Sequence, residues 1–518
     1  MSRSDVLTPA TLVRLCTAIK ALSLTLLAAW LLAFLTIGYP WAMVGSSFDA
    51  LSYLWMADAL SHGVSSPEAA LGSHLLFHGR LPPGYPIYLS AFGASAGAEG
   101  LWRANVAQII AVLAMTGLLC TYVWSRTGSG LTVLLVTLYT LAHPMITPWS
   151  FELFSEPLYT GLLLAVCLIA GRERLPRAWL WAAMLLGVAC LVRSMGLVLI
   201  PALLWWLARG SWPRAILAGV VAAAPTVIWS VLKGPPGEGA GGSYLAQLQT
   251  QLASAGGQWL EFALTQGTSL VRSLAPGALP EPLRLILGAA LLLLFARLAW
   301  RERRSPSLDT LFVLATLAIL AIWPFPGYLD RLSGPLVPLL LVAVIRAVAS
   351  GNSTEPKQNP GIVWISSGAL VIMLSMLMTL AKLTQPSIRS AEAELRPFSR
   401  NASVLGAEDP TFIAQVHLAS SLAASGLSEQ VPAGQCISTT FAYWVRLFSP
   451  VPVSDTVSPF SWRDNPCRFI FLINLASPRD GFNGIYPMPL PQDQYSLVFV
   501  SSETPEKPML AALIERKD

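Results

Sequence analysis

Runs of about 17 to 23 apolar residues recur along this 518-residue chain, and a helix of that length crosses the hydrocarbon core of a bilayer. Hydrophobic residues make up 54% of the sequence and charged residues only 12%, whereas soluble chains carry about 25% charged residues. These two features exclude a soluble enzyme and indicate a membrane protein with many spans. The formal net charge of +5 arises mainly from Lys and Arg in short loops between the runs, so it gives no sign of nucleic-acid binding.

The apolar runs predict about eleven transmembrane helices. They lie near residues 20–43, 104–123, 130–147, 155–171, 178–193, 195–208, 215–233, 284–300, 309–326, 328–349 and 361–383. Every second gap between them is basic, and the residues concerned are Arg126, Arg172, Arg174, Arg177, Arg209, Arg214, Arg297, Arg301, Arg303, Arg304, Arg346 and Lys357. Because cytoplasmic loops are enriched in Lys and Arg, we expect a cytoplasmic N-terminus and an external C-terminal tail.

Three polar regions are long enough to carry function outside the membrane. Two are loops of the transmembrane domain 1–383, at residues 44–103 and 234–283, and the third is the tail 384–518. The tail has the composition of a soluble domain, with a helix expected at 411–424 and strands at 436–440, 441–448, 468–475 and 495–500. We therefore expect an all-α polytopic membrane domain with a small α/β extracytoplasmic domain. In an oxidising compartment, Cys436 and Cys467 would form a disulfide there.

Asp49 stands at the start of the first external loop. It shares one face of the following segment with Tyr53, and an apolar stripe runs along the other face, which predicts an amphipathic helix at the membrane interface. Two roles are open for the carboxylate. It either caps the helix N-terminus or acts as a general base that takes a proton from an acceptor hydroxyl.

The same loop contains a stiff segment at residues 80–86, Arg-Leu-Pro-Pro-Gly-Tyr-Pro. Three prolines and a glycine exclude a regular helix, so the segment is either a rigid connection or a wall of the substrate cavity. In the second case Arg80 and Tyr85 would line that cavity. His74 and His78 lie four residues apart and leave a divalent metal ion open, although no third ligand follows at a suitable spacing.

Four ionisable residues lie where predicted spans meet the outside, namely Glu156, Arg193, Lys233 and Arg331. Charges at that depth are costly unless they snorkel, pair or bind a ligand. Snorkelling is one reading of Arg193 and Lys233, and an ion pair with Asp330 or Glu156 is one reading of Arg331. The other reading is that the three basic groups converge on one anionic headgroup, because Arg is the preferred partner of phosphate.

Five short motifs recur in an order that resembles a known family. They are the Asp at the start of the long first loop, the segment 80–86, Ser-Glu-Pro-Leu-Tyr at 155–159, Leu-Val-Arg-Ser-Met-Gly at 191–196 and Tyr-Leu-Asp-Arg at 328–331. Together, over about residues 20–385, they resemble the GT-C glycosyltransferases, and among these the bacterial aminoarabinose and protein O-mannosyl transferases. The resemblance implies that a polyprenyl phosphate delivers a sugar to an acceptor at the outer face.

The resemblance also assigns roles to individual residues. Asp49 matches the family's base, and Arg331 matches the Arg that holds the donor phosphate. Because Asp49 is followed here by apolar residues, the second acidic role falls to Asp58, Glu68 or Glu156. The expected site is Asp49 and Glu156 for catalysis, Arg331, Arg193 and Lys233 for the donor phosphate, and Tyr53, Arg80, Tyr85 and Tyr328 for the substrate cavity.

The second external loop carries apolar residues between 244 and 275 that predict short helices on the membrane surface. In the family such a segment helps to close the donor cavity. The preceding Gly-Pro-rich stretch 234–239 is either a hinge or a simple linker.

The expected function is therefore inverting transfer of a sugar from a polyprenyl-phosphate donor to a lipid, glycan or protein acceptor, at the outer face of a bacterial cytoplasmic membrane. Arginine would stabilise the charge that develops on the leaving phosphate. A transporter or flippase of a lipid-linked sugar would need the same arginines but no base. A lipid-binding scaffold without catalysis is the third alternative.

Overall fold

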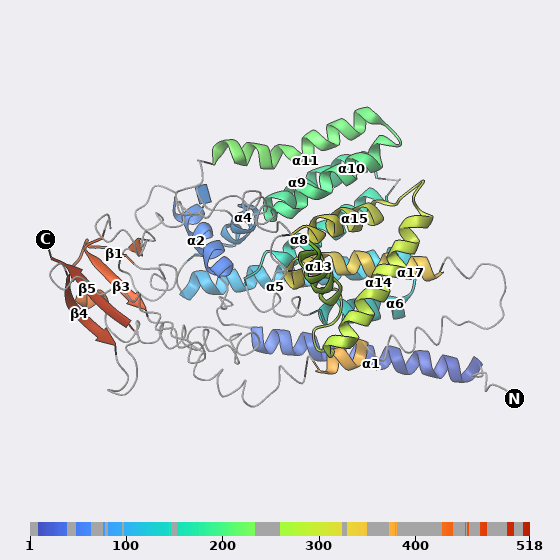
Figure 1. Cartoon of the computed structure of the whole chain (residues 1–518), viewed down its shortest axis with the longest axis horizontal. Helices are drawn as coiled ribbons and strands as arrows, with labels where there is room; N and C mark the ends of the chain where they lie inside the picture. Colours follow the sequence, from blue (N-terminus) through green and yellow to red (C-terminus); the bar gives the residue numbers. More distant parts are fainter. Residues whose placement is uncertain are drawn as a thin grey trace. The chain divides into compact units, whose positions relative to one another are not determined.

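The structure is a computed structural model, and most of its described residues are helical (Figure 1). It describes residues 9–38, 48–63, 76–77, 81–95, 98–143, 146, 153–172, 175–233, 259–323, 329–349, 372–378, 380, 427–438, 451, 453–454, 467–473, 495–501 and 511–517. The chain divides into two compact units. The first comprises Met1–Ile37, Pro82–Tyr85 and Gln108–Leu383, and the second comprises Gly38–Leu81, Pro86–Ala107 and Thr384–Asp518.

The first unit is a bundle of apolar helices. Its members are α1 (Pro9–Gly38), α6 (Gly130–Leu141), α8 (Glu156–Ala170), α9 (Ala178–Val192), η2 (Ser194–Val198), α10 (Leu199–Ala208), α11 (Trp212–Leu232), α13 (Trp259–Ser273), α14 (Glu281–Arg301), α15 (Leu308–Ala321), α16 (Leu329–Ser333), η4 (Gly334–Leu336) and α17 (Val337–Ala349). Helix α9 packs between α8 and α11, and α14 packs on both α13 and α17. Helices α4 (Gly84–Ala91) and α5 (Ala98–Thr127) contribute residues to both units.

Local sequence signals fix several helix starts. The side chain of Ser129 accepts a bond from the backbone N–H of Thr132 and caps α6, and Ser307 caps α15 in the same way through Thr310. Proline stands in the first turn of α8, α11 and α14, where its missing N–H costs nothing. Pro335 falls within the η4 turn, which joins α16 to α17 in place of one continuous α-helix.

Four helices in the described part of the chain are long and apolar enough to cross a membrane. They are Trp102–Thr127, Trp212–Leu232, Glu281–Arg301 and Leu329–Val348. Six further apolar helices are shorter, between 10 and 17 residues. The structure thus supports a membrane protein with several spans, whereas the expected number of eleven stays a prediction. The last expected span, 361–383, lies largely outside the described residues.

The first helix differs from its prediction, because α1 begins at Pro9 rather than near residue 20. Arg14 and Lys20 are therefore helical. An apolar run marks only the part of a helix that suits hydrocarbon, and long basic side chains at its end can extend toward water without breaking the backbone hydrogen bonds.

The second unit contains α2 (Phe48–His62), where the sequence predicts an amphipathic interfacial helix. The helix is present, but the amphipathic interpretation is wrong, because the polar face is covered too. Tyr53 is 2% exposed and Met56 is fully buried. Ala50, Ala57 and Ala59 are also fully buried, and such small side chains let neighbouring segments approach the helix closely.

The tail forms a five-stranded mixed sheet in the order β2-β1-β3-β5-β4. Its strands are β1 (Ile437–Ser438), β2 (Val453–Ser454), β3 (Phe469–Ile473), β4 (Tyr495–Ser501) and β5 (Ala511–Arg516), with the short helix α22 (Leu427–Gln430) before them. Strand β1 runs parallel to β2 and β3, and β5 is antiparallel to β3 and β4. The sequence indicates β1, β3 and β4 but misses β2 and β5; the expected helix 411–424 and strand 441–448 lie outside the described residues.

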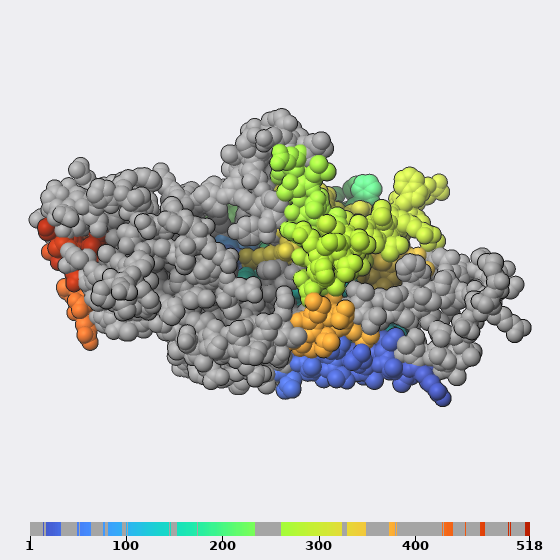
Figure 2. Space-filling view, turned by 60° about the horizontal axis from the view of Figure 1, so that its bottom comes forward, coloured from blue at the N-terminus to red at the C-terminus, as the bar shows by residue number. Residues whose placement is uncertain are grey.

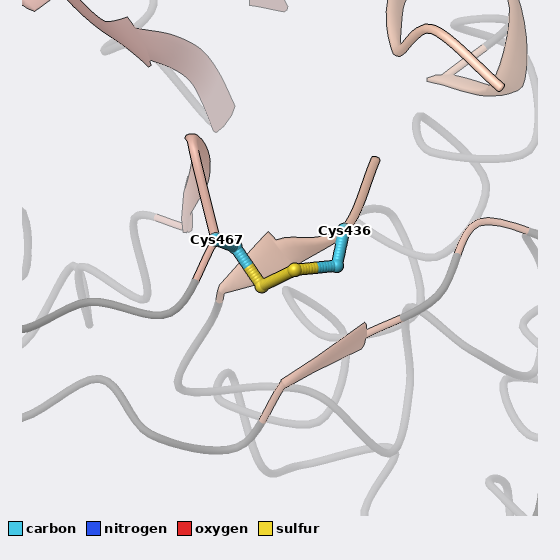
Figure 3. Close-up of a disulfide and its surroundings, with 2 residues drawn as sticks. All are labelled: Cys436 and Cys467. Atoms are coloured by element: carbon cyan, nitrogen blue, oxygen red, sulfur yellow. A yellow bond between two sulfur atoms is a disulfide. The ribbon is translucent and has the colours of Figure 1, made fainter. Parts of the chain in front are cut away.

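A disulfide joins Cys436 to Cys467, as the sequence predicts (Figure 3). The two Cα atoms lie 5.1 Å apart, within the range that a disulfide spans without backbone movement. The bond links the residue before β1 to the residue two before β3, so it fastens the parallel pair at the centre of the sheet.

Candidate functional site

Glu156, the first residue of α8, is completely buried and is bound by two arginines. Nη1 of Arg193 lies 2.5 Å from Oε1 of its carboxylate, and Nε of Arg331 donates to the same oxygen. The two arginine side chains are only 13% and 15% exposed. Three charged groups from distant parts of the sequence therefore form one cluster with a net charge of +1.

Two neighbours of Glu156 complete this cluster. The hydroxyl of Ser155 accepts a bond from Nη1 of Arg193 at 3.2 Å. The guanidinium of Arg331 lies over the ring of Phe154, with its central carbon 4.8 Å from the ring centroid. A cation over an aromatic face is attracted by the negative charge of that face. The chain leading into α8 thus holds both guanidinium groups as well as the carboxylate.

The backbone around Arg193 is fixed by a close contact. Arg193 is the extended residue between α9 and η2. Gly84, the first residue of α4, lies so close to the end of α9 that an added Cβ would be 2.6 Å from the carbonyl carbon of Leu191. Only glycine allows that approach. Gly84 therefore packs against the residues just before Arg193, and the bond from the Tyr85 hydroxyl to Oε1 of Gln108, at 2.6 Å, fixes the next residue.

The structure differs from the prediction for the end of the segment 80–86. Its last three residues, Gly84 to Pro86, form the first turn of α4, so the expectation that this segment excludes a regular helix is wrong for them. Proline is compatible with the first turn, because the N–H it lacks has no partner within the helix at that position.

The alternatives left open for the arginines are now decided in favour of ion pairs. Arg331 pairs with Glu156, whereas the adjacent Asp330 accepts a bond from Nη2 of Arg284 at 3.4 Å. Arg193 does not simply snorkel, because its guanidinium is turned to the buried carboxylate. Ion pairing and phosphate binding are compatible here, since two guanidinium groups share one acid.

An apolar pocket lies next to the cluster. Tyr159, Met195 and Leu332 line it, and each is one to three residues from Glu156, Arg193 or Arg331. The other lining residues include Phe312 and Leu336. This apolar wall lowers the local dielectric, which strengthens the attraction between the cluster and any anion that reaches it.

The C-terminal end of α13 is anchored beside α16. Nε2 of His143 lies 2.8 Å from the carbonyl oxygen of Ser273, and the hydroxyl of Ser333 donates to the same oxygen at 3.1 Å. The Tyr139 hydroxyl donates to the carbonyl of Leu274 at 2.9 Å. One of the short helices expected between 244 and 275 is present as α13, and its end is fixed two residues from Arg331. Residues 234–258, with the expected hinge or linker, lie outside the described residues.

Asp49 and Tyr53 belong to the second unit and are described there by themselves. Asp49 stands in the first turn of α2 and is partly exposed, whereas Tyr53 is buried. Further along the same helix, Asp58 pairs with His62, whose Nδ1 lies 3.1 Å from Oδ1 of Asp58. Elsewhere in this unit, burial raises the pKa of Tyr88 to about 12, so its hydroxyl stays protonated and donates to the Ala107 carbonyl.

The remaining expected site residues fall in different places. Lys233 caps the end of α11, and within the described part of the chain no hydrogen bond or ion pair joins it to the Glu156 cluster. Arg80, Tyr328, Glu68, His74 and His78 lie outside the described residues. Among the residues that the structure defines, no group of three or more His, Cys, Asp or Glu is placed to hold a metal ion.

No protein-family model and no curated protein matches the sequence. Among solved structures, the chain aligns with the crystal structure of ArnT from Cupriavidus metallidurans in the apo state. The alignment covers 95% of this chain and 97% of that one, at 14% identity and a TM-score of 0.51. The chain has the GT-C fold.

Two other alignments are weaker. ArnT from the same organism bound to undecaprenyl phosphate aligns over 95% of this chain and 97% of its own, at 14% identity and a TM-score of 0.48. The oligosaccharyltransferase of Archaeoglobus fulgidus, tethered with an acceptor peptide, aligns over 91% of this chain and 70% of its own, at 10% identity and a TM-score of 0.46. The GT-C fold expected from the short motifs is confirmed by the apo ArnT alignment.

Sequence reasoning missed three residues of the cluster's surroundings. Ser155 and Phe154 precede Glu156 directly, so their position beside a buried acid was the available signal. Gly84 gave a weaker signal, because a glycine among prolines reads as a turn residue. That it touches the chain before Arg193 depends on how α4 and α9 pack.

Proposed function

We propose that this protein is a membrane glycosyltransferase that moves a sugar from a polyprenyl-phosphate donor to a hydroxyl-bearing acceptor. The observation that carries the proposal is the cluster of Arg193 and Arg331 around the buried Glu156, within a GT-C fold. One acid neutralises only one of the two guanidinium groups. The remaining positive charge, fixed at the ends of helices, suits a lipid-linked phosphate.

Asp49 is proposed as the general base. It takes the proton of the acceptor hydroxyl, whose oxygen attacks the anomeric carbon of the sugar while the bond from that carbon to the phosphate oxygen breaks. The configuration inverts, and the polyprenyl phosphate leaves with the bonding electrons. The two arginines stabilise the charge that grows on the phosphate, which is the contribution that fixed cations make best in a site of low dielectric.

Glu156 is proposed to act through the arginines. Its carboxylate is buried and bonded, so its role here is to hold the two guanidinium groups within reach of one phosphate. The donor class is supported by ArnT from Cupriavidus metallidurans, which has been solved bound to undecaprenyl phosphate. Lys233 is proposed as a further partner of the donor phosphate. The substrate cavity is proposed to be lined by Tyr53, Arg80, Tyr85 and Tyr328.

The proposed topology places the cluster on the outer face of a bacterial cytoplasmic membrane, with eleven spans, a cytoplasmic N-terminus and an external tail. Cysteines introduced at Ser243 and Ser502 should then react with an impermeant thiol reagent added outside, and one at Ser305 should react only from inside. Reversed labelling at any of the three would contradict the orientation.

The decisive experiment uses purified full-length protein in nanodiscs with a synthetic polyprenyl-phosphate sugar whose sugar is radiolabelled. We expect label to move to an added acceptor fraction in the wild type, and to a much smaller extent in Arg331→Gln. A protein that binds the donor yet releases no polyprenyl phosphate would refute the transferase. Movement of the donor across the bilayer of reconstituted vesicles would then support the flippase alternative instead.

A further inference from the structure

At the ends of the helices away from Glu156, two acids pair with half-buried arginines. Oε1 of Glu302 accepts from Nη2 of Arg346 at 2.6 Å, and its Oε2 accepts from the hydroxyl of Thr310 at 2.7 Å. Oδ1 of Asp309 accepts from Nη2 of Arg126 at 3.1 Å. These two carboxylates therefore pair with Arg346 and Arg126 rather than with the exposed arginines of the α14–α15 turn.

Four exposed arginines follow closely on one another at the end of α14, and a fifth binds the two residues that come next. Arg297, Arg301, Arg303 and Arg304 are all exposed. Arg209, at the end of α10, donates to the carbonyl of Pro306 at 2.8 Å and to the hydroxyl of Ser305 at 2.6 Å. The α10–α11 turn and the α14–α15 turn therefore form one surface.

Within the described residues, Arg303 and Arg209 have neutral partners. Arg303 donates to the carbonyl of Trp300 and lies over its ring, 4.5 Å from the centroid. Arg209 is held by a carbonyl and a hydroxyl. Such contacts fix the direction of a guanidinium group without cancelling its charge, so Arg209 and Arg303 both contribute positive potential to this surface.

An exposed apolar stripe runs along α14 toward these arginines. Ile286, Leu293 and Trp300 are spaced by seven residues and so share one face of α14, and they are 66%, 72% and 69% exposed. On the neighbouring turn, Trp212 is 70% exposed at the start of α11. Figure 2 shows the yellow-green residues of α13 and α14 on the molecular surface. The order of aliphatic, tryptophan and arginine side chains matches the parts of a phospholipid, from the acyl chains through the interface to the headgroup.

We propose that the α10–α11 and α14–α15 turns form a binding site for an anionic phospholipid. Arg209, Arg303 and Arg304 bind the phosphodiester and the rest of its headgroup, and Trp300 and Trp212 contact the glycerol region. The acyl chains lie along Ile286 and Leu293. This site goes beyond the proposed transferase and does not rest on it, because it lies at the other end of the helices from Glu156.

The test measures binding of phosphatidylglycerol to full-length protein in a neutral detergent, with phosphatidylcholine of the same chains as the reference lipid. We expect saturable binding that prefers phosphatidylglycerol and weakens with salt. Arg303→Gln with Arg304→Gln should weaken it about tenfold or more, because two of the charges that attract the headgroup are lost. Arg209 is kept, since it also holds the turn.

The matched control removes two other exposed arginines, Arg172 and Arg177, from the turn between α8 and α9. Arg172→Gln with Arg177→Gln should leave the affinity within about twofold of wild type. An equal loss in both pairs would refute the site and leave only general attraction by positive charge. Equal binding of both lipids, or full competition by glycerol 3-phosphate, would refute a lipid site as well.

A second measurement avoids dependence on variants. Photoactivatable phosphatidylglycerol, mixed at one part in twenty into phosphatidylcholine nanodiscs, should crosslink to wild-type peptides that contain residues 205–214 or 297–307. Unlabelled phosphatidylglycerol should compete, and unlabelled phosphatidylcholine should not. Crosslinks spread evenly over the other apolar helices would overturn the proposal.

Discussion

The guanidinium group of Arg331 is bonded to the carboxylate of Glu156, which lies 175 residues earlier in the chain. Asp330, its immediate neighbour, is instead bonded to Arg284. Arg193 binds the same oxygen of Glu156. One buried acid therefore joins three parts of the fold, namely α8, the residue after α9, and α16. Substitutions of these residues should therefore have non-additive effects on stability.

Replacement of that acid should destabilise the fold and weaken the donor site together. We expect Glu156→Gln to lower the free energy of unfolding by about 3 to 5 kcal/mol, because two guanidinium groups then lose their buried counter-charge. Unfolding of the purified protein by increasing sodium dodecyl sulfate in mixed micelles measures this change.

Two further variants make that result specific. Glu281→Gln removes a carboxylate that pairs with Arg272 but is 64% exposed, and should cost no more than about 1 kcal/mol. Glu156→Gln combined with Arg331→Met should be less destabilised than the sum of its single changes. Additive losses would show that Glu156 and Arg331 do not act as a pair.

Gly84→Ala should weaken donor binding through Arg193. The added methyl group meets the backbone of Leu191 and Val192 and must displace the residues before Arg193. We expect the donor Kd to rise severalfold, with a smaller change in single-turnover rate at saturating donor. Isothermal titration with polyprenyl phosphate in nanodiscs measures the affinity.

The control for this position is Gly117→Ala, because a Cβ there meets nothing within 4 Å. It should leave the Kd unchanged. In an Arg193→Gln background, Gly84→Ala should add little further loss, since the group through which it acts is already absent. A full additional loss in that background would contradict a positioning role.

Asp49→Asn should abolish transfer while fold and donor binding remain. A missing general base costs roughly 10² to 10⁴ in rate. A helix cap would be served almost equally by Asn, since both side chains accept the same backbone bond, so the substitution separates the two roles. Single-turnover transfer with saturating donor is the measurement.

Asp58→Asn is the matched control on the same helix, because its carboxylate pairs with His62. It should retain most of the transfer rate. Arg331→Gln should differ from both by weakening donor binding as well as turnover, because a phosphate contact exists in the ground state and the transition state alike. Near wild-type turnover in Asp49→Asn would end the general-base assignment.

Loss of the disulfide should loosen the tail without disturbing the helices. The bond spans 31 residues, and a loop of that length contributes about 3 to 4 kcal/mol through its effect on the unfolded chain. We expect Cys436→Ser with Cys467→Ser to become sensitive to limited proteolysis within the tail. Reduction of the wild type should have the same effect, whereas Cys167→Ala with Cys190→Ala, both buried in helices, should not.

The sequence by itself determined the membrane character, the positions of most helices and the disulfide. Apolar runs and basic loops report on the solvent around each segment, which is a local property of consecutive residues. Cys436 and Cys467 could be paired because no other cysteines lie in the polar tail. The order of short motifs was sufficient to indicate the GT-C fold, which the alignment with apo ArnT confirms at 14% identity.

Only the tertiary structure decided which charges meet. The sequence left Asp330 and Glu156 open as partners of Arg331. The packing of α8 against η4, which follows α16, selects Glu156. Packing likewise covered the polar face of α2 and brought Gly84 against the end of α9. Periodicity states which residues share a face, but what covers that face depends on segments far away in the chain, and so does the partner of a buried charge.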